Sequence, residues 1–398
     1  MLRRPAFVLA LALTAAAALP PATAAASASF TVQNTTLPAN TGSTLLQTFY
    51  NRQDPALAGQ LQSTLQTQVN TNLANLSALV NQNLAQLQVG DFLRANAHAL
   101  NLASKGLAVD YASDLKLFSL SGALGVGVHA DPSASANSYQ IRAQNGHLPG
   151  LGAALNINLT LGINLGFFEL PDLGAFELKR LKVYASLYSG SQNSLLSNSQ
   201  FSFTAWGLHG QYQLVEAIAL APAGLFRWGG VNVASGLTYG SQSVTFTDTQ
   251  VSSGSQTTPV TFQGKTLNVV SAWTGKAQLT LDGSSYAIPI EASTSLQLGY
   301  VFTLFVGAGF DLNFGSTELR STSKVPVGVS VNNGAGTTAD LLSSDVLLTL
   351  KDSASPRWGD ARGFAGLQLN FGVLALFGQV AADSNRTFAG QLGARAFW

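Results

Sequence analysis

Histidines and carboxylates are the first residues to consider as carriers of chemistry in this chain. The sequence contains no cysteine, and its four histidines are His98, His129, His147 and His209. None of them has a serine or an aspartate at the spacing of a known local nucleophile motif. Paired histidines at metal-ligand spacing and an aspartate-rich calcium loop are missing from the sequence as well. We therefore expect no enzymatic activity, no metal and no cofactor, and we interpret the histidines as structural polar residues.

A small set of charged residues shares one face of predicted strands with glycine, serine, asparagine and threonine. These residues are Arg180, Lys182, Asp311, Arg362, Asp383 and Arg395. Two interpretations are open for a closed sheet in which this face points inward. Either the four cations and two anions pair across the interior, which we favour, or the excess of cations biases a pore toward anions.

Aromatic residues form a second set on the same predicted inward face. They are Tyr184, Tyr188, Phe305, Phe364, Phe377 and Phe397. They either line a path for a hydrophobic ligand or pack against a leucine stripe of an N-terminal helix, and packing is slightly favoured. The glycine pairs Gly125/Gly127 and Gly307/Gly309 lie within strands of this face. We interpret them as space or curvature in a strand, not as phosphate-binding loops.

The elements that carry these residues show a period of two, which is typical of β-strands. The clearest example is residues 153–165, where leucine and isoleucine alternate with asparagine, threonine and glycine. Ten segments have the length that a tilted membrane strand needs. They are residues 117–130, 153–165, 178–189, 199–214, 229–242, 291–302, 303–315, 361–371, a strand ending at Asp383, and 387–398.

This pattern predicts an antiparallel transmembrane β-barrel of about ten strands. The charged fraction is only 10%, and beyond residue 19 no run of about 20 apolar residues could form a membrane-spanning helix. An even strand count places the longest connections, including 243–288 and 319–360, at one end of the barrel. Residues 243–288 contain further strand-like pieces, so twelve strands is the alternative. A secreted β-sandwich is a weaker rival, because its apolar strand faces need buried partners.

The first part of the chain has a different character. Residues 1–26 have the basic start, apolar run and small-residue end of a signal peptide. Residues 27–104 read as a polar linker followed by amphipathic helices, with a narrow leucine stripe beginning at Leu57 and Leu61. Asp91 suits the N-cap of a second helix. These helices pack in a coiled coil, against the periplasmic rim of the barrel, or inside its lumen as a plug; residues 105–398 form the barrel.

The final strand carries a recognisable ending. A polar residue, a glycine two positions on, and an aromatic terminus appear as Gln391, Gly393 and Trp398, with Ala396 where an aromatic residue is more usual. With the signal peptide and the alternation, this ending resembles Gram-negative bacterial outer-membrane β-barrel proteins. The resemblance implies outer-membrane lipid as surroundings and insertion by the barrel-assembly machinery. The net charge of +1 argues against a nucleic-acid partner.

Two functions fit these expectations. The first is a porin-like channel or uptake protein for a small or apolar solute, with the N-terminal helices as plug or gate. The long inward faces of small residues favour it, because they imply space. The second is a surface-exposed structural or adhesin-type barrel whose external loops bind a partner. A filled lumen with ordered loop hairpins would favour the second function.

Overall fold

The computed structural model describes residues 27–32, 36–86, 89–105, 109–112, 117–130, 150–168, 177–193, 199–222, 225–333 and 337–398. The predicted signal peptide and His147 lie outside these ranges. Within them, none of the helices is both long and apolar enough to cross a membrane.

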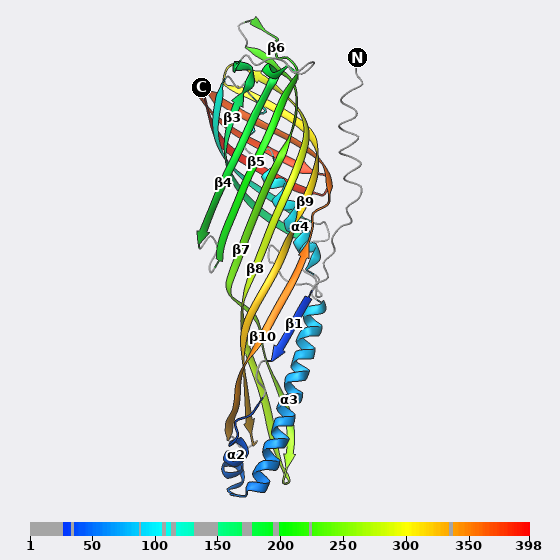
Figure 1. Cartoon of the computed structure of the whole chain (residues 1–398), viewed down its shortest axis with the longest axis vertical. Coiled ribbons are helices and arrows are strands. Elements are labelled where there is room, and N and C mark those ends of the chain that lie inside the picture. The colour runs from blue at the N-terminus through cyan, green and yellow to red at the C-terminus, as the bar shows by residue number, and fades with distance from the viewer. Residues whose placement is uncertain are drawn as a thin grey trace.

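Ten strands of the described chain pair in an antiparallel ring that closes between the last strand and the second (Figure 1). They are β2 (Phe118–Ala130), β3 (Leu151–Asn164), β4 (Leu181–Asn193), β5 (Ser199–Val215), β7 (Phe226–Phe262), β8 (Lys265–Leu298), β9 (Phe302–Asn332), β11 (Gly359–Phe371), β12 (Leu374–Asp383) and β13 (Thr387–Phe397). Short elements flank the ring: η1 (Leu165–Phe168), η2 (Leu178–Arg180) and β6 (Ile218–Ala219). The predicted β-barrel is confirmed. The barrel has ten strands and not twelve, because residues 243–288 lengthen β7 and β8 and add no further pair of strands to the ring.

The two faces of the ring follow the predicted alternation. In β2 the small and polar residues are buried, while Leu120, Leu124, Val126 and Val128 are more than two-fifths exposed on the outer surface. The same holds in β13, where Phe388 and Leu392 are exposed and Gln391 is buried. A water-soluble protein would bury such a face, so the barrel exterior needs an apolar environment.

Several inward aromatic rings lie against glycines of the neighbouring strand. The pairs are Tyr184 with Gly162, Phe364 with Gly307, Phe305 with Gly366 and Phe377 with Gly393. A Cβ atom on any of these glycines would collide with the ring that covers it. The aromatic rings therefore lie along the barrel wall, where each fills the space left by a missing side chain.

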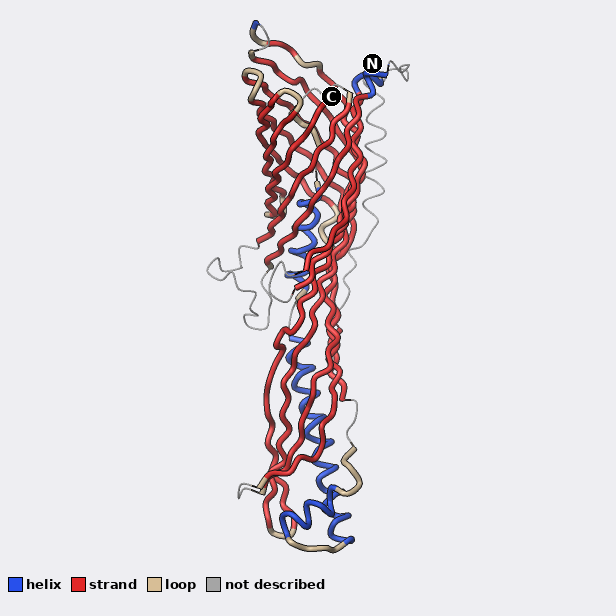
Figure 2. Tube along the Cα trace, turned by 90° about the vertical axis from the view of Figure 1, so that its left-hand side faces the viewer, coloured by secondary structure: helices blue, strands red, loops and turns tan. Residues whose placement is uncertain are grey.

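β7, β8 and β9 continue far beyond the barrel at the end opposite Trp398 (Figures 1 and 2). There β10 (Thr338–Ala354) pairs with β9, and β1 (Ser27–Val32) pairs with β10. These five strand segments form a twisted extension of the barrel sheet. The predicted polar linker from residue 27 is therefore wrong in part, because its first residues form a sheet strand. The backbone pairing of β1 with β10 outweighs the weak strand signal of residues 27–32.

Two helices pack on this extension, α2 (Thr41–Tyr50) and α3 (Pro55–Gln86). The Asp54 carboxylate accepts hydrogen bonds from the backbone N–H groups of Ala56 and Leu57, which satisfies two free donors at the start of α3. From Leu61 to Leu73, one face of α3 is buried against the strands. The shared apolar core includes Leu61, Leu65, Val69, Leu73, Phe49, Val260, Phe262, Leu267, Val269, Val327, Val329 and Val331.

The leucine stripe thus packs far from Trp398. Of the three locations considered for it, neither the lumen nor the rim near Trp398 holds α3. The partner of the stripe is a valine-rich surface that exists only because β7, β8 and β9 extend past the barrel.

A third helix, α4 (Gly90–Ser104), runs inside the barrel (Figure 2). Its N-cap is Val89, and Asp91 lies inside the first turn, so the predicted N-cap is wrong by two residues. Ala95, Ala99 and Ala103 form a stripe of small residues. The helix backbone at Ala99 approaches Gly127 of β2, and that at Ala95 approaches Gly152 of β3, so closely that a side chain on either glycine would clash. Small residues on both surfaces let the helix fit the lumen.

Leu65 provides a test of the extension core. Replacing the fully buried Leu65 by Ala should lower the free energy of unfolding of the extension by about 2–5 kcal/mol, because the remaining cavity loses packing. Hydrogen exchange should show faster exchange of the β8 amides near Leu267 and unchanged exchange in β12 and β13. The exposed neighbour Gln60, changed to Ala, is the control and should leave both regions unchanged. Equal loss of protection in the barrel would contradict a separate core.

Candidate functional site in the barrel lumen

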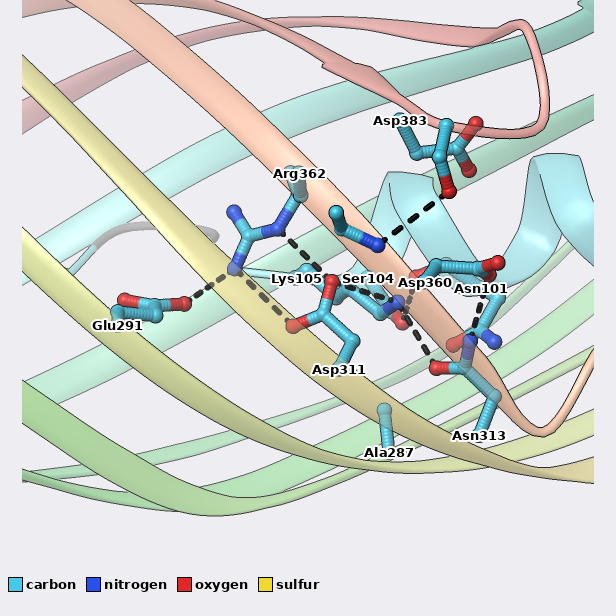
Figure 3. A network of polar contacts seen from close by, with 12 residues as sticks. Asn101, Ser104, Lys105, Ala287, Glu291, Asp311, Asn313, Asp360, Arg362 and Asp383 are labelled. Carbon is cyan, nitrogen blue, oxygen red and sulfur yellow. Dashed lines mark hydrogen bonds and ion pairs between the residues drawn. The ribbon is translucent and has the colours of Figure 1, made fainter.

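The centre of the lumen holds a network of buried charges (Figure 3). Arg362 of β11 lies between two carboxylates: its Nη2 donates to Glu291 of β8 and its Nε donates to Asp311 of β9 at 3.0 Å. All three side chains are almost fully buried. The network joins three strands of the wall, each contributing an inward position of its period-two pattern.

We call α4 and the described residues after it, Lys105 and 109–112, the plug. The plug joins this network through Lys105, the residue that follows α4. The Lys105 ammonium donates to Asp311 at 3.0 Å and to Asn313 at 2.9 Å. The Asn313 amide in turn donates to Asp360 at 2.7 Å. Asn385, in the turn between β12 and β13, donates to the other oxygen of Asp360. Charge-assisted hydrogen bonds therefore tie the end of α4 directly to β9, and Asp311 and Asn313 continue the network to β11.

The segment after α4 makes a second set of contacts nearer Trp398. The Tyr111 hydroxyl donates to Glu291 at 2.6 Å, and its ring stacks on Phe305 and packs at a tilt against Phe364. Burial raises the pKa of Tyr111 well above its usual value, and the Glu291 charge adds to this, so the phenol stays protonated and acts as a donor. His209 completes this group, with its Nε2 3.7 Å from Glu291.

Arg395 of β13 holds the same segment from the other side. Its guanidinium contacts the Asp110 carboxylate at 2.9 Å and donates to the Val109 carbonyl at 2.9 Å. The Phe377 and Phe397 rings face the guanidinium carbon at 4.7 and 5.9 Å. Cation–π contacts of this kind are strongest where water is excluded. The lumen is thus occupied by residues 90–105 and 109–112.

The predicted lumen charges have different positions. Arg362, Asp311 and Arg395 belong to the buried network, and Lys182 is also buried. Arg180 does not belong there, because η2 turns it to the rim, where it pairs with Glu177 and Glu216. Asp383 lies at the β12–β13 turn, where it accepts backbone hydrogen bonds from Asn385 and Thr387.

The predicted aromatic set does not line an open path. Tyr184, Phe305, Phe364 and Phe377 cover glycines of the wall, and Tyr188 stacks on Phe203 at 5.3 Å. Phe397 packs beside residues 109–112. The expected contact of these rings with the leucine stripe is wrong. The segment after α4 takes that place, because α3 finds its partner in the extension.

The residues of the predicted terminal signal have definite contacts as well. The Gln391 amide donates to the Lys105 carbonyl at 2.8 Å, so it holds the plug. Gly393 makes room for the Phe377 ring. Ala396 pairs with Leu374 and Leu120 in the sheet, and Trp398 is half exposed at the end of the barrel. The Trp398 carbonyl accepts hydrogen bonds from Leu117 and Phe118.

Several residues of this site were not selected from the sequence. They are His98, Lys105, Asp110, Tyr111, His209, Glu291, Asn313 and Asp360. Glu291 carried a usable signal, because it shares its phase with Ser293 and Ser295. Lys105, Asp110 and Tyr111 follow a helix without any periodic pattern, so no sequence signal placed them in a lumen.

A cavity lies at each end of the plug. The cavity nearer Trp398 has a volume of about 760 Å³ and is bordered by Asp110, Tyr111, Lys182 and Arg227. The cavity at the opposite end has about 400 Å³ and is bordered by His98, His129, Arg357 and Asn385. Residues of the plug border both cavities.

Arg362 is the residue whose loss should matter most. Changing Arg362 to Leu leaves Glu291 and Asp311 charged in a buried site, and breaking a buried pair in this way costs about 3–5 kcal/mol. We expect the urea midpoint of the barrel in detergent micelles to fall accordingly. Arg320, an exposed arginine paired with Glu318 in the extension, is the control, and Arg320→Leu should leave the midpoint nearly unchanged. Equal effects of the two changes would show that the network does not stabilise the barrel.

Comparisons with known proteins give a family and a set of distant barrels. The translocator domain of the autotransporter NalP from Neisseria meningitidis is 12% identical, with 75% of this chain and 93% of that chain covered and a TM-score of 0.26. Omp33 of Acinetobacter baumannii is 8% identical (71% and 99% covered, TM-score 0.22), and a Pseudomonas aeruginosa FadL homologue is 7% identical (76% and 98% covered, TM-score 0.23). With TM-scores this low, no inference about this chain rests on these likenesses.

No curated protein matches the chain. A family model, by contrast, covers nearly all of it. Residues 25–398 match the model described as Lsa36-like, and the chain therefore belongs to the Lsa36-like family.

Proposed function

We propose that this protein is a bacterial outer-membrane barrel that closes its own lumen and presents the β7–β10 extension outside the cell as a structural or binding surface. One observation carries the proposal. α4 and the charge network fill the barrel, while three wall strands continue without a break into an extension with its own apolar core. On this proposal the lumen network is structural and the protein is not an enzyme.

The apolar exterior supports a membrane setting. Large apolar side chains cover the outer wall, and aromatic residues gather toward both ends of the ring. Near Trp398 these are Phe167, Phe168, Phe226, Tyr300, Phe302 and Phe371, and toward the extension they are Trp206, Tyr286, Phe310, Phe314, Trp358 and Phe388. Outer-membrane barrels have such an apolar band between two aromatic girdles. A closed ring also leaves no unpaired strand edge within the hydrocarbon.

The lengths of the connections support the orientation. At the Trp398 end, β8 and β9 are joined by residues 299–301, and β11 and β12 by residues 372–373. The extension, with most of the length of β10, lies at the opposite end. Outer-membrane barrels have short periplasmic turns and long external loops. By this rule the extension faces outward and Trp398 faces the periplasm, where the barrel-assembly machinery is expected to act.

Transport of a small solute through a gate is the second candidate. The observation in its favour is that several buried polar side chains between α4 and the wall lack a hydrogen-bond partner in the described structure. They include both amide atoms of Asn101, as well as Asn156 Oδ1 and Asn158 Oδ1. Unpaired buried polar atoms are costly, and water would satisfy them if α4 moved out. The cavities at both ends would then join.

Cysteine labelling tests the location and the orientation. The native chain has no cysteine, so each introduced thiol gives the only signal. Thr266→Cys lies in an exposed position by the β7–β8 turn, and Tyr300→Cys lies in an exposed turn at the Trp398 end. On whole cells a membrane-impermeant maleimide should label Thr266→Cys and leave Tyr300→Cys unlabelled until the cells are lysed. The reverse pattern would overturn the orientation.

Planar-bilayer recording distinguishes closed display from transport. We expect no stable channel conductance from the purified chain, because α4 fills the ring. A matched variant carries Ser104→Cys and Gly240→Cys, because a Cβ atom on Gly240 of β7 would lie 3.4 Å from that of Ser104, which is close to disulfide geometry across the helix–wall contact. Wild-type conductance that is absent in the oxidised variant and returns with reductant would favour gated transport and refute the closed lumen.

A further inference from the structure

Three ligand-type side chains from distant parts of the chain meet at the extension end of the lumen. They are His98 of α4, Asp360 of β11 and Asp383 at the end of β12. One donor atom from each lies within 4.8 Å of the others, and His98 Nδ1 is 3.8 Å from Asp360 Oδ2. Ring closure and the insertion of α4 are both needed to bring them together.

We propose that His98, Asp360 and Asp383 bind a divalent transition-metal ion such as Zn²⁺, and that this ion fastens α4 to the barrel wall. His98 is 3% exposed, and its Nδ1 has no hydrogen-bond partner in the described part of the chain. A buried imidazole nitrogen without a partner is costly, and a metal ion would satisfy it. Neutral imidazole is a common ligand of such ions.

The carboxylates are already oriented for this role. Asp360 accepts hydrogen bonds from the side-chain amides of Asn313 and Asn385, one on each oxygen. Asp383 uses a single oxygen, Oδ1, to accept from the backbone N–H groups of Asn385 and Thr387 at 2.8 and 2.9 Å. Its second oxygen remains for a metal. Outer contacts of this kind fix carboxylate ligands and strengthen metal sites.

The ligand atoms of His98 and Asp360 are already close to the spacing that a bound metal ion requires. A tetrahedral zinc ion with bonds of about 2.1 Å holds its ligand atoms about 3.4 Å apart. The His98–Asp360 distance of 3.8 Å must therefore shorten by a few tenths of an ångström. Small side-chain rotations suffice for this pair, and Asp383 must move somewhat farther.

His98 borders the 400 Å³ cavity, so water from this cavity could supply a fourth ligand. The His129 ring stacks on His98 with 5.3 Å between centroids, which limits rotation of the imidazole. Arg94, Arg357 and Arg386 also border this cavity, together with Asp91. These arginines oppose cation entry, so a moderate affinity is expected.

The ligand set selects the class of metal. One imidazole nitrogen with two carboxylates suits Zn²⁺, Co²⁺ or Ni²⁺, whereas Ca²⁺ and Mg²⁺ take oxygen ligands alone and in larger number. A bound ion would add a link between the plug and the β11–β12 part of the wall. Metal would thereby resist displacement of α4, which is a form of control beyond the proposed display function.

Calorimetric titration tests the site on the full chain in detergent micelles after treatment with a chelator. We expect one Zn²⁺ per chain, no comparable binding of Ca²⁺ or Mg²⁺, and a rise in unfolding temperature with Zn²⁺, because the ion binds only the folded state. His98→Gln and Asp383→Asn should each weaken Zn²⁺ binding at least about tenfold. Even the loss of a residue that only hydrogen-bonds to a metal ligand weakens metal affinity by about 10- to 100-fold. Both variants should lose the rise in unfolding temperature.

Asp91→Asn is the matched control, because Asp91 borders the same cavity without belonging to the cluster. It should bind Zn²⁺ like the wild type. Circular dichroism shows whether each variant is folded, and a misfolded His98→Gln is replaced in the comparison by Asp383→Asn. The proposal is overturned if the folded wild type binds no Zn²⁺ at millimolar concentration, or if Asp91→Asn weakens binding as much as the cluster variants. Neither result would bear on display by the extension.

Discussion

The burial of charge in the lumen is the constraint on which the rest of the structure depends. A guanidinium and two carboxylates in a water-poor interior are tolerated only if every charge has a partner in good geometry. Arg362 by itself balances only one of the two negative charges of Glu291 and Asp311, and Lys105 supplies the second positive charge. The wall therefore requires the plug as much as the plug requires the wall. This mutual need explains why α4 and the segment after it occupy one position in the ring.

Shape complements this charge balance. A ten-strand ring has a narrow interior, so an α-helix fits only if both surfaces are small. Ala95, Ala99 and Ala103 face glycines of β2 and β3, which lets the helix backbone come close to the strands. Elsewhere glycines of the wall are covered by aromatic rings of adjacent strands. Glycine thus has two roles in this barrel. Some glycines let α4 approach the wall, and others leave space for the aromatic side chain of an adjacent strand.

Continuity of the strands joins the barrel to the extension. β7, β8 and β9 pass from one to the other as strands, so no flexible linker separates the two parts. The N-terminal segment crosses both: β1, α2 and α3 belong to the extension and α4 belongs to the lumen. Movement of the plug would therefore pull on α3, whose buried face is held by the extension core. The extension and the helix in the lumen are coupled by this arrangement.

The alternation of residues by itself determined the class of fold, the ten ring strands and the end at which the long connections lie. Period two assigns each side chain to a face of its strand, and this is local information. It correctly turned Arg362, Asp311 and Arg395 inward. It also allowed the inference that the glycines in β2 leave room, although not what fills that room.

The tertiary structure alone decided which residues meet. Knowing the face of a strand on which a residue lies does not show which residue it contacts across the lumen. That contact depends on how the ring closes and on which segment enters it. Residues 27–32 form a strand because they pair with the edge of β10. The leucine stripe of α3 packs on the parts of β7, β8 and β9 that extend beyond the barrel, and the sequence did not show that these strands are so long. Lys105, Asp110 and Tyr111 have no periodic pattern, and the contacts of His98 with Asp360 and Asp383 join three distant segments. Their roles follow from long-range packing, which no local spacing encodes.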